Sequence, residues 1–267
     1  MPSRTATADY AIDIFRATAK RHGAGPDRAW LGIYAALLWY ETTGRLDRPW
    51  LPHIIDADKL RRPKEGALGA WQTRAVKVEE YLAQQMGCEP SAVRSRLDQL
   101  MRRREYARLQ RQNPLGIAFL GLVWHALRTF GDEALTYETE QPAQRAFPGI
   151  GFPGRSTTPS MDVLIRKHNR PRAIVSAKWS LRHDRINDLT NECPAYKQAA
   201  SWGRHPFDFI VVTNEFDPAR LGKLLDDTCI DAVVHVHKAV VMEVCGLNGR
   251  LNAILDLPEL FVRTRSL

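Results

Sequence analysis

The residues that point most directly to chemistry are two carboxylates and one lysine in the second half of the chain. Asp162 opens a predicted strand, Lys178 lies at the end of the next, and Glu192 follows 14 residues after Lys178. Metal-dependent hydrolysis of a phosphodiester requires carboxylates that hold Mg²⁺ against the phosphate and a cation near the attacking water. Adjacent strands can bring Asp162 and Lys178 together, and a helix from Arg185 onward can return Glu192 to them. By themselves, a lone Asp and Lys on alternating strands would more often form an exposed surface ladder.

The segment around these residues makes the expected chemistry more specific. Residues 176–192, SAKWSLRHDRINDLTNE, resemble the active-site and recognition block of the CCGG-family (NgoMIV-like) type II restriction endonucleases, a branch of the PD-(D/E)xK nuclease superfamily. In that family the second acidic position of the motif is Ser or Cys, as at Ser176. A Glu downstream of the lysine supplies the missing carboxylate, as Glu192 does here, and an RxDR signature matches residues 182–185. The similarity covers residues 159–196.

The resemblance implies a role for each residue of the motif. Asp162, Lys178 and Glu192 would be catalytic. Asp162, Glu192 and the backbone carbonyl of Ala177 would hold Mg²⁺, which is therefore the expected cofactor. Ser176 would be a spacer or would support the site through a hydrogen bond.

The RxDR signature implies recognition of double-stranded DNA through its bases. Arg182, Asp184 and Arg185 would read C·G and G·C pairs, since Arg pairs bidentately with guanine and a carboxylate accepts from cytosine N4. The family's reaction is cleavage at a palindromic site with a CCGG-type or interrupted CC-N-GG core, which leaves 5′ overhangs and 5′-phosphates. A palindrome needs two copies of the site, so a homodimer is expected, and a tetramer is also open.

Two positions depart from the family pattern. Pro159 is separated from Asp162 by two residues, and the helix predicted over residues 115–130 lacks the acidic residue that the family often carries there. A further metal ligand could come from the N-terminal half or the first strand. The candidates are Glu79, Glu80, Glu105 and Glu138, and the sequence leaves the choice open.

The pattern of apolar residues predicts an α/β fold that can position these side chains. Strands are predicted over residues 134–141, 161–167, 173–180, 207–213 and 230–237, and helices over 115–130, from 185 onward, over 218–226 and over 251–260. With the resemblance, residues 113–267 are expected to form a PD-(D/E)xK restriction-endonuclease-like core, a mixed central sheet flanked by helices. Residues 1–112 are expected to form a helical region for dimerisation or contacts with flanking DNA.

Residues 78–104 allow a different function. They read as a helix, a turn at Gly87 and a second, arginine-rich helix, which is the order of a helix-turn-helix. An ordinary helical hairpin with a solvated basic face is the simpler interpretation. Two alternatives to a restriction enzyme follow: a helix-turn-helix DNA-binding regulator that does not cleave, and a structure-specific repair or mobile-element nuclease on the same fold.

The composition agrees with a DNA-binding protein without requiring one. The 267 residues include 38 Lys and Arg against 30 Asp and Glu, and this net charge of +8 favours a polyanionic partner. No apolar run approaches the roughly 18 residues of a membrane span, and the first residues do not resemble a signal peptide. A cytoplasmic protein without a membrane partner is therefore expected, and the resemblance to restriction endonucleases implies a bacterial one.

The cysteines and two histidines raise the question of a structural metal site. Cys88, Cys193, Cys229 and Cys245 lie far apart with no CxxC pair, which argues against a structural zinc site and against a disulfide scaffold. His235 and His237 have the spacing of metal ligands on one face of a strand. They lack a third ligand nearby, so they are more typical of core or surface histidines.

Overall fold

The structure, a computed structural model, describes most of the second half of the chain and parts of the first. The described residues are 9, 11–13, 15–16, 19–20, 25–33, 77, 80–81, 83–84, 87, 89–91, 114–152, 159–181, 183–201, 206–245 and 249–267. Most of the helix-turn-helix candidate, residues 78–104, and most of the region 1–112 lie outside this part.

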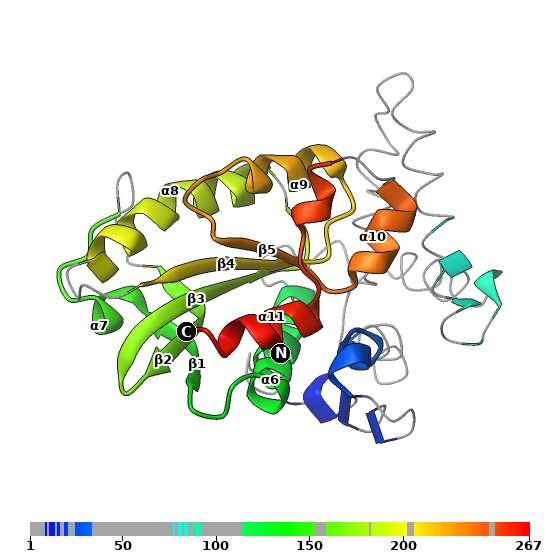
Figure 1. Ribbon diagram of the computed structural model, residues 1–267, viewed down its shortest axis with the longest axis horizontal. Helices are drawn as coiled ribbons and strands as arrows, with labels where there is room; N and C mark the ends of the chain where they lie inside the picture. The colour runs from blue at the N-terminus through cyan, green and yellow to red at the C-terminus, as the bar shows by residue number, and fades with distance from the viewer. Residues whose placement is uncertain are drawn as a thin grey trace.

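A five-stranded mixed sheet in the order β1-β2-β3-β4-β5 forms the centre of the described structure (Figure 1). Its strands are β1 (Thr136–Pro142), β2 (Ser160–Lys167), β3 (Arg170–Lys178), β4 (Asp208–Thr213) and β5 (Ala232–His235). β1, β2 and β3 are antiparallel neighbours, whereas β3, β4 and β5 run parallel. The predicted fold class, an α/β core with a mixed central sheet flanked by helices, is confirmed.

β2 and β3 form the hairpin that carries the motif residues. Their turn is only two residues long, His168 and Asn169, and both have positive φ values, 48° and 64°. Two left-handed residues match the twist of a tight hairpin. Because the turn is so short, β3 begins at Arg170 rather than at the predicted residue 173. Because the register pairs Val163 with Val175, Asp162 lies opposite Ser176.

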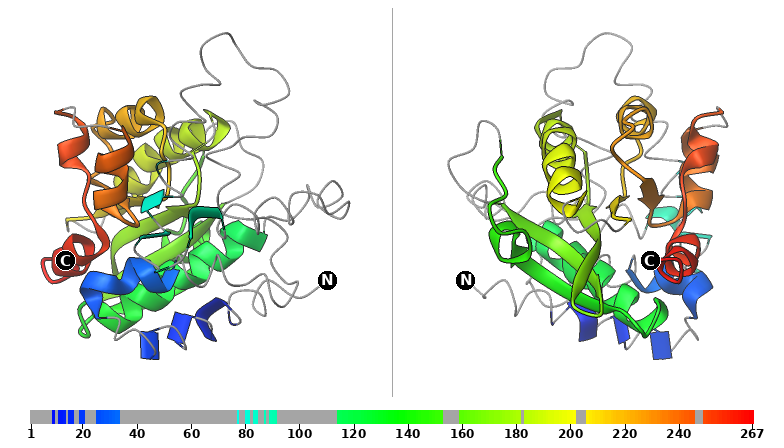
Figure 2. Two further views of the ribbon diagram at one scale, coloured as in Figure 1. Left: turned by 90° about the vertical axis from the view of Figure 1, so that its right-hand side faces the viewer. Right: turned by 60° about the vertical axis from the view of Figure 1, so that its left-hand side comes forward.

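Helices cover both faces of the sheet (Figures 1 and 2). On one face lies α6 (Pro114–Phe130), whose Phe119, Leu122 and Val123 are fully buried. On the other lie α8 (His183–Ser201) and α9 (Pro218–Leu225). Further short elements in the described part of the chain include η1 (Pro26–Arg28), α7 (Ala143–Ala146), α10 (Lys238–Cys245), η5 (Leu251–Ala253) and α11 (Leu257–Thr264).

The C-terminal elements differ from the prediction. β5 ends at His235, and α10, which was not predicted, follows it directly. The closing helix begins at Leu257 rather than at Leu251, because Asp256 forms a capping box with Glu259 and Pro258 occupies the first turn. Residues 251–253 form only a short 3-10 turn. Among the described residues, no helix is long and apolar enough to cross a bilayer.

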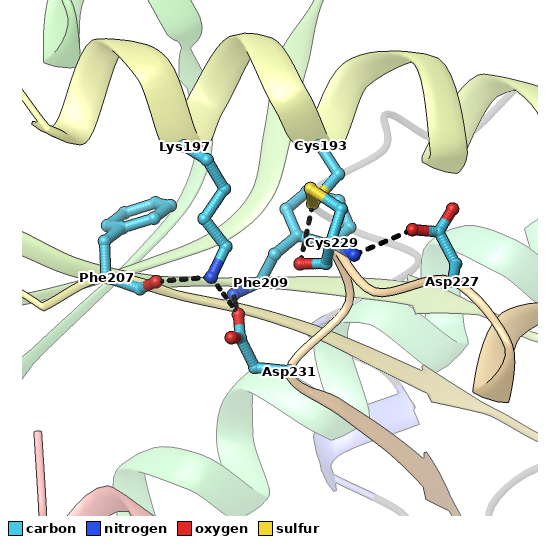
Figure 3. The surroundings of a disulfide bond; sticks show 7 residues. All are labelled: Cys193, Lys197, Phe207, Phe209, Asp227, Cys229 and Asp231. Carbon is cyan, nitrogen blue, oxygen red and sulfur yellow. Dashed lines mark hydrogen bonds and ion pairs between the residues drawn. A yellow bond between two sulfur atoms is a disulfide. The ribbon is translucent and has the colours of Figure 1, made fainter.

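One disulfide joins Cys193 of α8 to Cys229, in the segment before β5 (Figure 3). The sequence argument against disulfides is therefore wrong for this pair. Cysteines 36 positions apart carry no local spacing signal, and only the fold brings their Cα atoms to 6.1 Å. Beside it, Lys197 of α8 forms an ion pair with Asp231 and donates to the carbonyl of Phe207 (2.7 Å), so α8 is fixed to the sheet at two neighbouring points.

Candidate active site

The carboxylate of Asp162 is the centre of the motif. Its Oδ2 atom accepts hydrogen bonds from the Ser176 hydroxyl (3.1 Å), the Ala177 backbone N–H (2.9 Å) and the Lys178 ammonium (2.5 Å). The Asp162 and Lys178 side chains are each 20% exposed. Since side chains two residues apart on a strand share a face, Ser176 and Lys178 project to the same side. This alternation explains why a Ser-x-Lys spacing serves one carboxylate on the neighbouring strand.

Helix α8 covers the face of the sheet on which these side chains lie. Lys178 is in register with Thr213, and Ile174, on the same face, is in register with Phe209. Phe209 stacks against Tyr196 of α8, with ring centroids 6.0 Å apart. Trp179, the residue after Lys178, instead packs edge-on against Phe119 of α6 at 5.2 Å. The helix that carries Glu192 therefore lies over the face that carries Asp162 and Lys178.

The sequence of α8 divides into a buried stripe and a polar edge. Ile186, Leu189, Cys193 and Tyr196 recur at helical spacing and are buried. Arg185, Asp188 and Glu192 are half-buried and lie along one border of this stripe. Asp188, which the sequence motif did not single out, therefore lies on the same edge as Arg185 and Glu192.

The structure describes the predicted base-reading residues only in part. Arg182 and the side chain of Asp184 lie outside the described residues, whereas the backbone of Asp184 belongs to the first turn of α8. Arg185 is half-buried, and within the described part of the chain it has no hydrogen bond or ion pair that would occupy its guanidinium.

The candidates for a further acidic ligand have different surroundings. Glu138 forms an ion pair with Arg166 at 3.1 Å, whereas Glu79 and Glu105 lie outside the described residues. The register of β1 and β2 instead places Glu140 opposite Asp162, between the partners of Val163 and Met161. Glu140 has a left-handed φ of 50°, which is uncommon for a non-glycine residue. The position of Glu140 relative to Asp162 depends on the register of the two strands, which periodicity alone does not reveal.

Asp162 fits the role of a magnesium ligand through its second oxygen. All described hydrogen bonds to this carboxylate fall on Oδ2, so Oδ1 has no donor among the described residues. Within the described part of the chain, no three or more His, Cys, Asp or Glu side chains lie close enough to hold a metal together. A carboxylate oxygen is a ligand type that Mg²⁺ prefers, and the ion usually keeps several waters beside one or two carboxylates.

The ends of the parallel strands bring further polar residues to the same edge of the sheet. Lys178, Thr213 and His235 are in register, and Thr213, Asn214, Glu215 and His235 are all buried. The Asn214 N–H donates to the carbonyl of Trp179 at 3.3 Å, so pairing of β3 with β4 continues past Lys178. Sequence reasoning missed Glu215, because a single Glu after a strand reads as an ordinary loop residue.

His235 and His237 are packed into the protein rather than arranged around a metal. His237 stacks on Trp30 with ring centroids 3.8 Å apart, and its Nε2 is 2.7 Å from the Tyr81 hydroxyl. The His235 Nδ1 lies 2.9 Å from the carbonyl oxygen and 3.1 Å from the backbone nitrogen of His237, and its Nε2 is buried with no hydrogen-bond partner in the described structure. Burial lowers the pKa of His235 to about 3 and that of His237 to about 4.

These lowered pKa values predict loss of stability in mild acid. Above pH 6.5 both imidazoles are neutral in the folded and unfolded states. Below pH 6.5 the unfolded chain takes up protons first, and the loss continues down to the folded pKa values. At pH 5 each histidine should cost about 2 kcal/mol of unfolding free energy. Urea unfolding at pH 7.5 and pH 5.0 should show that His237→Gln loses about 2 kcal/mol less than wild type. The exposed-turn variant His168→Asn should behave as wild type, and equal losses in all three proteins would contradict the prediction.

Comparison with known proteins yields only distant similarity. No protein-family model matches the sequence, and no curated protein is significantly similar to it. Among solved structures, the chain is similar to metal-depleted Ecl18kI in complex with uncleaved, modified DNA, with 12% identity and a TM-score of 0.39 over 100% of this chain and 85% of that one. The complex of metal-depleted Ecl18kI with uncleaved DNA gives 14% identity and a TM-score of 0.38 over 97% and 84%. At these scores the similarity adds nothing to the description of the site.

Proposed function

We propose that this protein is a Mg²⁺-dependent type II restriction endonuclease of the PD-(D/E)xK superfamily. Its substrate would be double-stranded DNA with a palindromic site and a CCGG-type or CC-N-GG core, cut to leave 5′ overhangs and 5′-phosphates. The observation that carries this proposal is the shared oxygen of Asp162, to which Ser176, Ala177 and Lys178 all donate. This geometry fits a strand pair that holds an acid and a lysine together at a reacting phosphate.

Asp162, Glu192 and the backbone carbonyl of Ala177 would hold Mg²⁺. When bound, the ion would offset the charge of the scissile phosphate and lower the pKa of an attacking water. Lys178, fixed by its ion pair with Asp162, would orient that water and stabilise the negative charge that develops on the phosphate. Ser176 would fix the rotamer of Asp162 through its hydrogen bond rather than bind the metal.

Sequence recognition would come from the residues immediately after the catalytic strand. Arg182, Asp184 and Arg185 would contact the edges of neighbouring G·C pairs in the major groove. The position of Arg185 in the first turn of α8, seven residues after Lys178, supports this role. A homodimer would present two such readers to the two halves of a palindrome, and residues 1–112 would contribute to dimerisation or contact the flanks.

A single plasmid digest tests this function against its alternatives. With Mg²⁺, the purified protein should convert a sequenced plasmid into discrete fragments, and with EDTA it should leave the plasmid intact while still retarding it in a gel. Sequencing the fragment ends should give a G·C core and 5′ extensions. Retardation without cleavage in Mg²⁺ would instead support the DNA-binding regulator. Cleavage only of branched or nicked DNA would support the structure-specific nuclease.

A further inference from the structure

Glu215 lies in the turn after β4, and its side chain is only 1% exposed. Its Oε1 accepts from the backbone N–H groups of Phe216 (3.0 Å) and Asp217 (2.9 Å). Its Oε2 accepts from the Leu181 N–H (2.8 Å) and from the Arg220 guanidinium (3.1 Å). Among the described residues, the groups that contact this carboxylate are these four donors, which matches the ionised form.

The charge of Glu215 is balanced within the protein. Burial raises the pKa of Glu215, while the Arg220 guanidinium and the backbone N–H groups of Leu181 and Asp217 act in the opposite direction. Arg220 belongs to α9, whose first turn is fixed by Asp217, since that carboxylate accepts from the N–H groups of Ala219 and Arg220. The guanidinium is therefore presented to Glu215 from a capped helix.

The bond to Leu181 connects this network to the candidate site. Leu181 lies three residues after Lys178 and immediately before Arg182, at the junction between β3 and α8. Two hydrogen bonds hold this junction. The Asn214 N–H donates to the Trp179 carbonyl, and the Leu181 N–H donates to the Glu215 carboxylate. If the backbone between Lys178 and Arg182 followed a different course, residues 182–185 would lie at a different position relative to Lys178.

We propose that Glu215 is a positioning residue that fixes where residues 182–185 begin relative to Lys178, and so sets the accuracy of site recognition. This inference rests on the proposed function. Base readout requires arginine guanidinium groups and a carboxylate within hydrogen-bond distance of the bases. Small displacements of these groups therefore cause a large loss of discrimination between sites. Glu215 would therefore affect the choice of site without touching DNA or metal.

The test is Glu215→Gln, which keeps the size of the side chain and removes its charge. The readout is the ratio of kcat/KM on the cognate site to kcat/KM on a site with one inner G·C pair changed. We expect this ratio to fall at least about 10-fold, close to the effect of Arg185→Ala, because each good base contact supplies a comparable discrimination. Affinity for a non-cognate duplex in EDTA should not change.

The matched control is Asp231→Asn, which removes a carboxylate that binds the far half of α8 through Lys197 and accepts from the Phe209 N–H at 2.6 Å. It should lower stability but leave the discrimination ratio as in wild type. If Glu215→Gln does not fold, Arg220→Gln gives a milder test, and Arg220→Lys should restore part of the ratio. Wild-type discrimination in Glu215→Gln, or equal losses in Asp231→Asn, would overturn the inference. A wild-type protein that does not cleave DNA would instead overturn the proposed function.

Discussion

The Lys178→Ala variant should lose about 1,000-fold in single-turnover cleavage of the cognate site, an increase of about 4 kcal/mol in the activation free energy. Its ammonium lies 2.5 Å from Asp162 Oδ2, its side chain is only 20% exposed, and alanine would leave no positive charge at this position. Specific binding, measured by gel retardation in EDTA, should persist, because the residues proposed to read bases remain. Quenched-flow cleavage of a labelled duplex with excess enzyme gives the chemical rate directly.

Two further variants define what this result means. Lys167→Ala removes a lysine from the opposite end of β2, near the hairpin turn, and should cleave at the wild-type rate. Asp162→Asn retains an acceptor for the Ala177 N–H but lacks the charge, and it should lose cleavage as severely as Lys178→Ala. If Lys178→Ala cleaves plasmid DNA as fast as wild type, the catalytic assignment is wrong.

Local patterns were enough to predict the strands that hold Asp162, Ser176 and Lys178. The apolar runs before Lys178 and Thr213 gave β3 and β4 to within a few residues, because buried parallel strands read as continuous hydrophobic segments. The contact between the Asp162 and Lys178 side chains was also predicted, because two consecutive strands joined by a short turn lie next to each other in the sheet. Because side chains on a strand alternate between the two faces of the sheet, Ser176 and Lys178 lie on the same face, which explains the Ser-x-Lys spacing.

The parts that the sequence did not predict depend on contacts between distant segments. Glu215 matters because of Leu181, 34 residues earlier in the chain, and no periodicity links these two positions. Likewise, α10 was missed because His235 to His237 continued the apparent strand, whereas in the fold the chain turns there and His237 packs on Trp30. Tertiary packing decided both outcomes.

Reduction of the Cys193–Cys229 disulfide should lower the unfolding free energy by about 4 kcal/mol, the chain-entropy expectation for a cross-link that closes a loop of this length. The cross-link joins α8, one residue after Glu192, to the segment that leads into β5. Guanidinium unfolding with and without dithiothreitol should show the difference, and non-reducing peptide mapping should show the linked peptides. Cys229→Ser should reproduce the effect of the reductant and should be insensitive to it.

Cleavage should be less sensitive to reduction than stability is. The inner face of α8 keeps Ile186, Leu189 and Tyr196 in the core, and Lys197 still binds Asp231 when the sulfurs separate. The reduced protein should therefore cut DNA normally at low temperature and lose activity earlier on heating. Cys245→Ser, at a half-buried cysteine outside the disulfide, is the matched control and should change neither property. Equal unfolding midpoints with and without dithiothreitol, with the linked peptides present, would show that the cross-link does not stabilise the fold.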